Sequence, residues 1–453
     1  MRSIWIAPVF GLAWSCGGDV DNSPQSVVRD ASVDALSVAD SSVDALRDSE
    51  ASGAESDVAS CAFSGFGPPT TYDTAYVSVS LFAYAPQGGP PDFAVSEPYG
   101  PDGGGAVLNY EVFANSGTGA FSPGTFHGAS GINFDDAVIG DFRRGGFADI
   151  ASVQLSPPVV RNGVFTVDRN LGDGDYDNQL TSYNTPDPGG SLVAGDFNGD
   201  GFLDLAIAGV GLEQPCLENC QWYAFLLVYP NLGDGTFGSA VTYSNVGGEM
   251  TSIATGDFDG DGHLDIALPP NAIMLNQGDG TFGDPVALPN VPSSVSGVDS
   301  GSYEGWVVPW VVGDFNGDGL TDIATSATTT ANVDELIVFF STGGGAFGQP
   351  TTYAVSAAPQ HMVVGDFNGD GHPDIAIQYQ GQGSTDGDVN APLPIGLLLN
   401  RGDGSFGSET SYTMGPNPCW IAAADFNGDG VSDLAVVNGG SANGVTVMLS
   451  QCQ

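Results

Sequence analysis

Carboxylate and amide side chains alternate with other residues in five nine-residue segments of this chain. The segments read D-F-[ND]-G-D-G-x-x-D and span Asp196–Asp204, Asp257–Asp265, Asp314–Asp322, Asp366–Asp374 and Asp425–Asp433. Oxygen ligands at positions 1, 3, 5 and 9 suit a hard cation, and Ca²⁺ takes about six to eight of them. Glycine at position 6 permits a turn that a Cβ would obstruct. The repeated motif therefore predicts calcium-binding loops, about five of them in this chain.

The same loops contribute to an extreme negative charge. The 453-residue chain has a formal net charge of −46, and its 8 basic residues are all arginines. We expect no nucleic-acid partner, because the phosphate backbone would be repelled. Without a cation, the carboxylates of each loop also repel one another. Calcium binding is therefore expected to contribute to folding.

Short strands joined by turns are expected to position these loops. The chain contains 67 Gly and 29 Pro and shows no convincing helical period, which favours strands. The motif recurs at intervals of about 50 to 60 residues, and each interval holds four strand-like segments. An Asp-Gly hairpin turn recurs at Asp173, Asp234, Asp279 and Asp403. Four strands per repeat form the unit of a β-propeller blade. In the sixth repeat these segments are residues 362–365, 374–378, 395–400 and 405–413.

Two earlier repeats lack a complete loop. Residues 141–151 keep both ends of the pattern but carry Arg143 and Gly145 at positions 3 and 5. We expect no calcium there, with a guanidinium partly in place of the cation. Residues 92–95 match only the strand that follows a loop. Together with the five complete copies, these segments predict seven blades.

The last repeat ends without a fourth strand, and a matching segment lies near the N-terminus. Residues 66–72 match residues 347–353, a fourth strand in the fifth repeat. The N-terminal segment is therefore predicted to complete the last blade and close the ring, which removes exposed strand edges. The same alignment places Cys61 and Cys452 in one hairpin and predicts a disulfide between them. The pairing of three other cysteines stays open: Cys216, Cys220 and Cys419.

The N-terminal residues predict export and a tether. Residues 1–16 contain one early Arg and an apolar run too short to span a membrane. They end in Cys16 and are similar to a bacterial lipoprotein signal, in which that Cys is lipidated; the alternative is a plain signal peptide. Residues 17–60 are acidic, rich in Ser and Ala and free of aromatic residues, so we expect a disordered tether, or else a short amphipathic helix. The folded domain would then be residues 61–453.

These repeats resemble the FG-GAP/VCBS repeats of the integrin α-chain propeller and of many exported bacterial proteins. The resemblance implies an all-β, seven-bladed β-propeller similar to the N-terminal domain of integrin α chains, with each loop between the first two strands of a blade. It also implies the calcium ligands. The side-chain ligands would be Asp196, Asn198, Asp200, Asp204, Asp257, Asp259, Asp261, Asp265, Asp314, Asn316, Asp318, Asp322, Asp366, Asn368, Asp370, Asp374, Asp425, Asn427, Asp429 and Asp433. The backbone carbonyls at position 7 would come from Phe202, His263, Leu320, His372 and Val431.

Two candidate ligand sites are expected on the face away from these loops. The variable connections there carry Trp222, Tyr303 and Trp306, whose rings suit stacking on sugars or proteins, or else fill the core between blades. Residues five positions before each loop are expected to surround the central axis, where polar groups and an aromatic ring could form a small pocket. The candidates are Asp136, Ser191, Ser252, His361 and Trp420.

No catalytic signature stands out in the sequence. We find no G-x-S-x-G elbow, no Cys/His nucleophile pattern and no zinc spacing, and calcium explains the paired carboxylates better than acid–base chemistry does. The leading hypothesis is a monomeric, non-catalytic binding module for a glycan or a surface protein. It would be extracellular or an outer-membrane or cell-surface lipoprotein, held to the membrane only by its N-terminal lipid. The alternatives are a polysaccharide lyase or hydrolase and a structural assembly subunit.

Overall fold

All regular secondary structure in the described part of the chain is β-strand. The computed structural model describes residues 63–74, 80–84, 90–97, 108–129, 136–154, 163–171, 181–185, 189–212, 222–244, 246, 253–291, 310–328, 334–379, 392–416, 418–438 and 444–452. Within these residues, no helix of the length and apolarity needed to cross a membrane is found. The signal segment and the tether lie outside the described residues, and so does Cys61.

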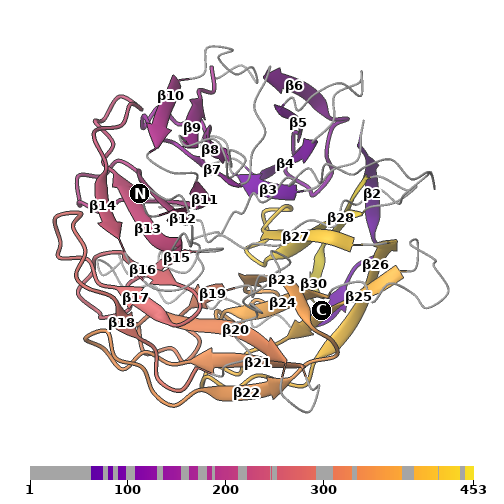
Figure 1. The fold of residues 1–453 in the computed structure, drawn as a ribbon. Helices are drawn as coiled ribbons and strands as arrows, with labels where there is room; N and C mark the ends of the chain where they lie inside the picture. Colours follow the sequence, from indigo (N-terminus) through magenta and orange to yellow (C-terminus); the bar gives the residue numbers. More distant parts are fainter. Residues whose placement is uncertain are drawn as a thin grey trace, which may run out of the picture.

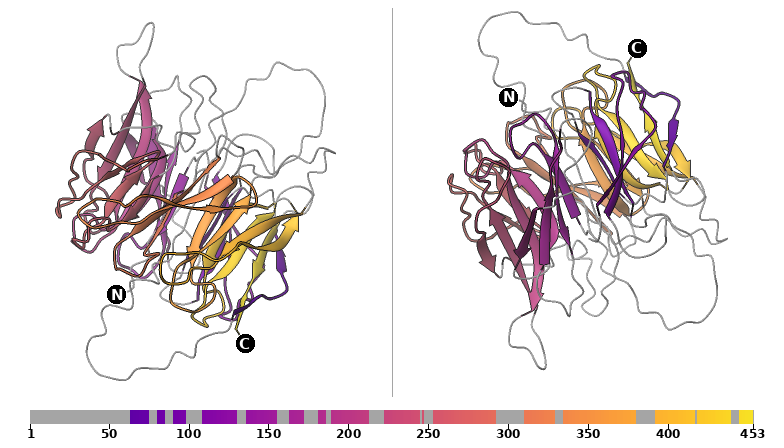
Figure 2. Two further views of the ribbon diagram at one scale, coloured as in Figure 1. Left: turned by 90° about the horizontal axis from the view of Figure 1, so that it is seen from below. Right: turned by 90° about the horizontal axis from the view of Figure 1, so that it is seen from above.

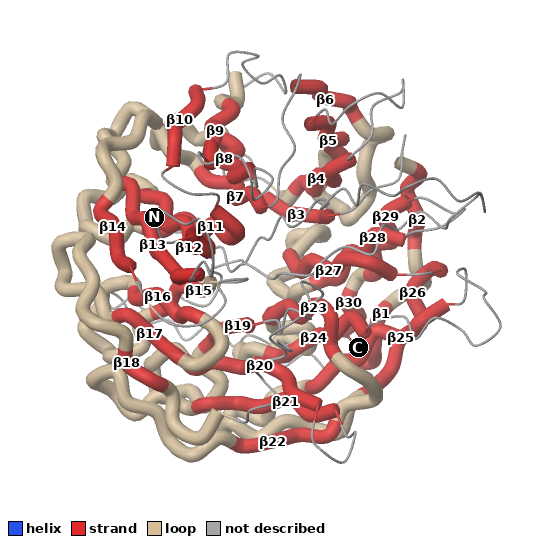
Figure 3. Tube along the Cα trace, in the orientation of Figure 1, coloured by secondary structure: helices blue, strands red, loops and turns tan. Residues whose placement is uncertain are grey.

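The strands form four-stranded sheets arranged around a ring (Figures 1 and 3). We number these sheets as blades in chain order. Blades 1 to 3 consist of β3 (Ser80–Tyr84), β4 (Asp92–Glu97), β5 (Leu108–Phe113) and β6 (Thr125–Ala129); β7 (Asp136–Gly140), β8 (Asp149–Gln154), β9 (Gly163–Asp168) and β10 (Thr181–Thr185); and β11 (Gly189–Gly195), β12 (Asp204–Leu212), β13 (Trp222–Tyr229) and β14 (Val241–Ser244).

The next three blades repeat this order of antiparallel neighbours. They consist of β15 (Ala254–Gly256), β16 (Asp265–Leu268), β17 (Ala272–Met274) and β18 (Val286–Ala287); β19 (Trp310–Gly313), β20 (Asp322–Thr328), β21 (Asp334–Phe339) and β22 (Thr351–Ala354); and β23 (Pro359–Gly365), β24 (Asp374–Tyr379), β25 (Pro392–Leu398) and β26 (Thr410–Pro416).

Blade 7 combines both ends of the folded domain. Its strands are β27 (Pro418–Ala424), β28 (Asp433–Asn438), β29 (Gly444–Met448) and, from the N-terminal side, β2 (Thr70–Asp73). The pairing of β2 with β29 runs from Thr70 opposite Val447 to Asp73 opposite Gly444. In both views of Figure 2, an indigo N-terminal strand accordingly lies among the yellow C-terminal strands. The predicted closure of the ring by the two terminal segments is therefore confirmed.

The N-terminal segment is divided differently from the prediction. Instead of one strand over residues 66–72, it forms β1 (Phe63–Phe66) and β2, separated by three residues without strand structure. β1 pairs with β30 (Ser450–Cys452), and the backbone of Phe63 lies opposite that of Cys452. Because Cys61 and the side chain of Cys452 are not described, the Cys61–Cys452 disulfide stays a prediction, as do the pairings of the other cysteines.

The fourth strand of blade 6 begins later than expected. The prediction placed it at residues 405–413, whereas β26 begins at Thr410. A hairpin turn occupies the intervening residues, closed by a bridge between Asn400 and Phe406 and by the Arg401 N–H, which donates to the Ser405 carbonyl (2.9 Å). The same bridge recurs in four other blades, so this turn is part of the repeat.

Apolar side chains fill the space between neighbouring blades. One cluster joins Val193 and Leu226 of blade 3 to Ile266 of blade 4, and other clusters join other pairs of neighbours in the same way. Phenylalanine at loop position 2 belongs to this core and is fully buried in six blades, and burying each ring contributes about 1.5–3 kcal/mol. These residues are Phe142, Phe197, Phe258, Phe315, Phe367 and Phe426.

The fold class is thus an all-β propeller of four-stranded blades, as the sequence predicts. The described residues form seven such sheets. The number seven for the whole chain stays a prediction, because the segments between these sheets are only partly described.

Candidate metal centres

Each acidic loop joins the first and second strands of its blade. In blade 4 the loop Asp257–Asp265 follows β15 and leads directly into β16. Its glycines at positions 4 and 6, Gly260 and Gly262, have φ angles of 83° and 88°. A residue with a Cβ is disfavoured in this left-handed region. From the sequence, only the glycine at position 6 was predicted to be required for the turn. Position 4 has the same requirement, and the glycine found there in all five copies was the signal.

Hydrogen bonds within the loop turn its acidic side chains inward. In blade 4 the carboxylate of Asp257 accepts the N–H groups of Gly260 (2.7 Å) and Gly262 (2.9 Å). The carboxylate of Asp259 accepts the Asp261 N–H (3.0 Å), and that of Asp261 accepts the His263 N–H (2.9 Å). Asx turns of this kind hold a short segment in a fixed curve. These hydrogen bonds therefore fix the conformation of the loop and hold its carboxylate oxygen atoms close together.

The aspartate at position 9 also connects two parts of the blade. Asp265 is fully buried and accepts the N–H of Phe258 at one oxygen (2.8 Å) and the N–H of Asn276 at the other (2.8 Å). The four equivalent aspartates make the same two contacts. The sequence predicted a metal ligand at this position but not this structural role. One donor lies within the nine-residue motif, but the other lies beyond the third strand, and the motif alone does not indicate that second contact.

Burial strongly disfavours the charged form of these five carboxyl groups. It raises the pKa of Asp265 to about 7, and the neighbouring Asp259 and Asp257 raise that pKa further, whereas the two backbone hydrogen bonds oppose the shift. Burial likewise raises the pKa at the equivalent positions, to about 7 at Asp204, Asp322 and Asp433 and to about 8 at Asp374. A cation placed among these carboxylates would favour their charged forms.

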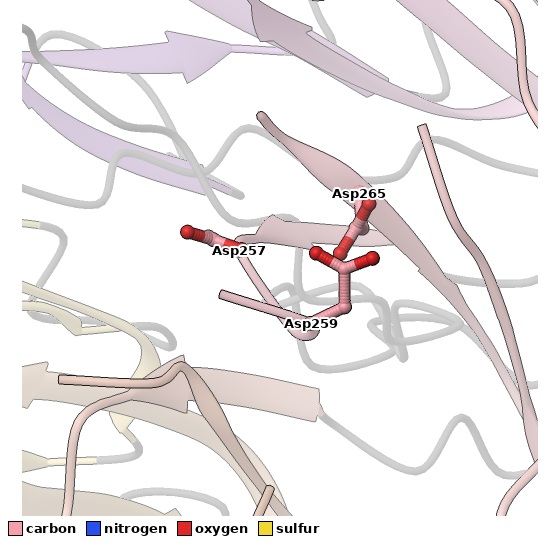
Figure 4. A group of neighbouring side chains, drawn as sticks. All are labelled: Asp257, Asp259 and Asp265. Atoms are coloured by element: carbon pink, nitrogen blue, oxygen red, sulfur yellow. The ribbon is translucent and has the colours of Figure 1, made fainter. Parts of the chain in front are cut away.

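The residues present fit a hard cation. In blade 4, ligand atoms of Asp257, Asp259 and Asp265 all lie within 4.8 Å of one another. Figure 4 shows the carboxylates of Asp259 and Asp265 facing each other, with Asp257 beside them. In blade 3, Oδ1 of Asp196 is buried and has no hydrogen-bond partner among the described residues. A buried carboxylate oxygen without a donor is costly, and a metal ion would satisfy it.

A second network ties five of the loops to the following blade. In blade 4, Nδ2 of Asn276 donates to the Phe197 carbonyl of the preceding loop (2.8 Å) and to the Leu264 carbonyl of its own loop (2.9 Å). The same connection joins other neighbouring blades through the pairs Asn231–Phe142, Ser341–Phe258, Asn400–Phe315 and, across the ring closure, Asn115–Phe426. The sequence reasoning interpreted this hairpin as a turn only. The recurring N-x-G-D-G-x-F pattern was the signal for the clamp.

In blade 2 a guanidinium faces the buried aspartate instead of further carboxylates. Arg143 donates from Nε to Oδ2 of Asp149 (3.0 Å) and from Nη2 to Oδ1 of Asp149 (2.6 Å). Nη2 also donates to the Asn170 carbonyl (2.7 Å). Burial still raises the pKa of Asp149, although Arg143 opposes the shift. The structure thus places the guanidinium of Arg143 against the buried aspartate, and its partial replacement of a cation in this loop stays a prediction.

The candidate ligand-binding residues on the opposite face are only partly described. His361 of β23 and Trp420 of β27 are both buried, and their ring centroids are 3.9 Å apart. Burial lowers the pKa of His361 to about 3, which keeps the imidazole neutral. Ser191 of β11 is also buried. The side chains of Asp136 and Trp222, and the whole residues Ser252, Tyr303 and Trp306, lie outside the described part, so both ligand sites stay predictions.

Comparison with known proteins identifies the repeat. Residues 222–268, 314–377 and 384–436 match the family model of the FG-GAP-like repeat, and residues 188–209 match that of the FG-GAP repeat. No curated protein shows significant sequence similarity to the chain.

Several solved propeller structures resemble the chain at low identity. The WD40 domain of Toxoplasma gondii coronin is 11% identical, with 87% of this chain and 90% of that chain covered and a TM-score of 0.48. The Dos1 propeller is 11% identical, with 85% and 95% covered and a TM-score of 0.45. An α-L-arabinanase of Penicillium chrysogenum in complex with arabinobiose is 11% identical, with 86% and 98% covered and a TM-score of 0.39. At these scores the similarities carry no argument about function.

Proposed function

We propose that this propeller of FG-GAP repeats binds Ca²⁺ in its five acidic loops and serves as a non-catalytic binding module outside the cell. The acidic cluster of Asp257, Asp259 and Asp265 is the observation that carries the proposal. Three carboxylates held this close repel one another, and burial adds to the cost of the charge on Asp265. Such an arrangement is expected where a divalent cation compensates the charge.

Bound Ca²⁺ would supply positive charge to each loop, and the chain's own residues would do the rest. The side chains at positions 1, 3, 5 and 9 would provide oxygen ligands, and the backbone carbonyl at position 7 would add another. Because Asn276 binds the Phe197 carbonyl of the preceding loop, a more rigid loop in blade 3 would also strengthen its contact with blade 4. Calcium would therefore stabilise the ring at the boundaries between blades.

The proposed ligand is a glycan or a surface protein, bound on the face away from the calcium loops. The proposal is supported by the charge of the chain and by the acidic signature of its loops, which calcium explains without catalysis. We further propose that the protein is exported, is monomeric and is attached to the outer membrane or cell surface by lipid on Cys16, or else is extracellular.

Glycan-array binding of the full chain, with Ca²⁺ and with EDTA, tests the binding role. We expect binding in Ca²⁺, loss of binding in EDTA and recovery when Ca²⁺ is returned, without release of a shortened glycan. A matched control is Asp261→Asn, which changes one exposed loop ligand and should weaken calcium binding in blade 4 alone. Product release from any bound glycan would contradict the non-catalytic role and favour the lyase or hydrolase.

A further inference from the structure

Arg144 lies at position 4 of the degenerate loop in blade 2, where the five intact loops have glycine. Its φ angle is 52°, in the left-handed region that disfavours a residue with a Cβ. Gly199 at the equivalent place in blade 3 has a φ angle of 72°. The turn is therefore kept in blade 2 although its glycine is replaced by an exposed arginine.

The side chain of Arg144 reaches the first intact acidic loop, Asp196–Asp204. Its guanidinium carbon is 4.8 Å from the centroid of the Phe202 ring, at position 7 of that loop. The guanidinium also packs against Gly201 at position 6, so closely that a Cβ built on this glycine would collide with Nη2 of Arg144. A positive charge from blade 2 is thus held against the outer side of the acidic loop in blade 3.

The carboxylate at position 1 also distinguishes this loop from others. In blade 5, Oδ1 of Asp314 accepts the N–H groups of Gly317 (2.7 Å) and Asp318 (3.1 Å). In blade 3, Oδ1 of Asp196 is buried and has no hydrogen-bond partner among the described residues. The blade 3 loop that Arg144 contacts is therefore also a loop in which Oδ1 of the first ligand, Asp196, has no hydrogen-bond donor among the described residues.

A second arginine near an acidic loop makes a different contact. Arg401 of the blade 6 hairpin donates from Nη1 to the Phe406 carbonyl (2.9 Å) and to Oγ of Ser405 (3.4 Å). Its guanidinium is thereby turned back onto its own hairpin. Arg144, in contrast, crosses a blade boundary and contacts Gly201 and Phe202 of the neighbouring acidic loop.

We propose that Arg144 lowers the Ca²⁺ affinity of the loop Asp196–Asp204 and makes it the last of the five loops to fill. This inference rests on the proposed calcium binding. A fixed unit charge beside a divalent ion repels it through partly exposed surroundings, which corresponds to about a two- to five-fold weaker affinity at moderate ionic strength. The blade 3 loop would then respond to calcium concentrations at which the other loops are already filled.

Calcium titration of the metal-depleted full chain by isothermal calorimetry tests the inference. Arg144→Gly should tighten the weakest binding step about two- to five-fold, with a larger gain at low salt. The glycine suits the left-handed backbone, so the variant should fold. Arg144→Lys keeps the charge and should leave the weakest step unchanged, whereas Arg144→Gln should behave like the glycine variant.

A double-mutant cycle locates the effect. Asp200→Asn changes an exposed ligand of the same loop and should weaken that binding step, and in this background Arg144→Gly should tighten the same step again. An unchanged titration for Arg144→Gly, or a gain in a step that Asp200→Asn leaves unaltered, would overturn the role of Arg144. Absence of Ca²⁺ binding in the unmodified chain would instead overturn the proposed function.

Discussion

Asp149 in blade 2 and Asp265 in blade 4 occupy the same place in their blades but face opposite charges. Both are fully buried, and each accepts a backbone N–H from the asparagine that follows the third strand, Asn170 (2.9 Å) or Asn276 (2.8 Å). Around Asp149 the loop provides the guanidinium of Arg143. Around Asp265 the loop provides two more carboxylates, those of Asp257 and Asp259.

The difference indicates that the aspartate at position 9 is first of all an architectural residue. In both blades the two oxygens of this aspartate bind a residue of the loop and the asparagine after the third strand. Both blades therefore bury a carboxylate. A buried carboxylate needs compensating positive charge. Blade 2 has that charge built into the chain, whereas the blade 4 loop provides only further carboxylates, which is the physical reason for proposing a metal ion there.

Arg143→Met should give the largest change. It leaves Asp149 buried without its charged partner, and breaking a buried pair in this way costs about 3–5 kcal/mol. We expect the free energy of unfolding, measured with urea, to fall by that amount equally with Ca²⁺ and with EGTA. The matched control is Arg401→Met, which removes a guanidinium from an exposed hairpin and should cost little. A loss that Ca²⁺ reverses would contradict the built-in cation of blade 2.

Asp265→Asn should have the next largest effect. An amide presents N–H to one of the two backbone donors that the carboxylate accepts. Leaving this buried donor unsatisfied costs about 1–3 kcal/mol, and the lost stabilisation by calcium adds to that cost. The urea-unfolding midpoint should fall in Ca²⁺, and the response to EGTA should shrink. Asp261→Asn is the control, because Asp261 is exposed and accepts the His263 N–H within the loop. Equal losses in the two variants would show that position 9 is a metal ligand alone.

Asn276→Ala should have the smallest effect of the three. It removes the two hydrogen bonds to the Phe197 and Leu264 carbonyls and the one that its Oδ1 accepts from the Gly278 N–H (3.0 Å), each worth about 0.5–1.5 kcal/mol. Hydrogen exchange should then increase at the boundary between blades 3 and 4. Gln277→Ala changes the exposed neighbour and should not alter exchange there. If exchange increases within blade 4 only, the asparagine does not act as a clamp between blades.

Much of this comparison could be predicted from local sequence. The nine-residue pattern placed the loops, the repeat interval placed the blades, and the loss of positions 3 and 5 identified blade 2. The match of residues 66–72 to a fourth strand predicted the closure, although β1 and β2 divide this segment between two partners. Each of these inferences depends on residues close together in the chain or on whole repeats that can be aligned.

The parts that were missed depend on contacts between blades. The Asn276 amide reaches the carbonyl of Phe197, a residue in the preceding repeat, and the Arg144 guanidinium reaches Phe202 in the following one. The N-x-G-D-G-x-F pattern marks the asparagine as a recurring residue, but the partner in the neighbouring repeat is not specified by any local spacing. The late start of β26 was missed for a more local reason, because the bridge between Asn400 and Phe406 uses residues that look like strand.

Converting blade 2 to the blade 4 pattern tests the account most directly. Arg143→Asn combined with Gly145→Asp restores oxygen ligands at positions 3 and 5, next to Asp141 and Asp149. Native mass spectrometry would count the Ca²⁺ ions on the folded full chain. The account predicts five ions on the original chain, one for each intact loop, and one more on the double variant. No bound calcium on the original chain, or the same count on both proteins, would contradict it.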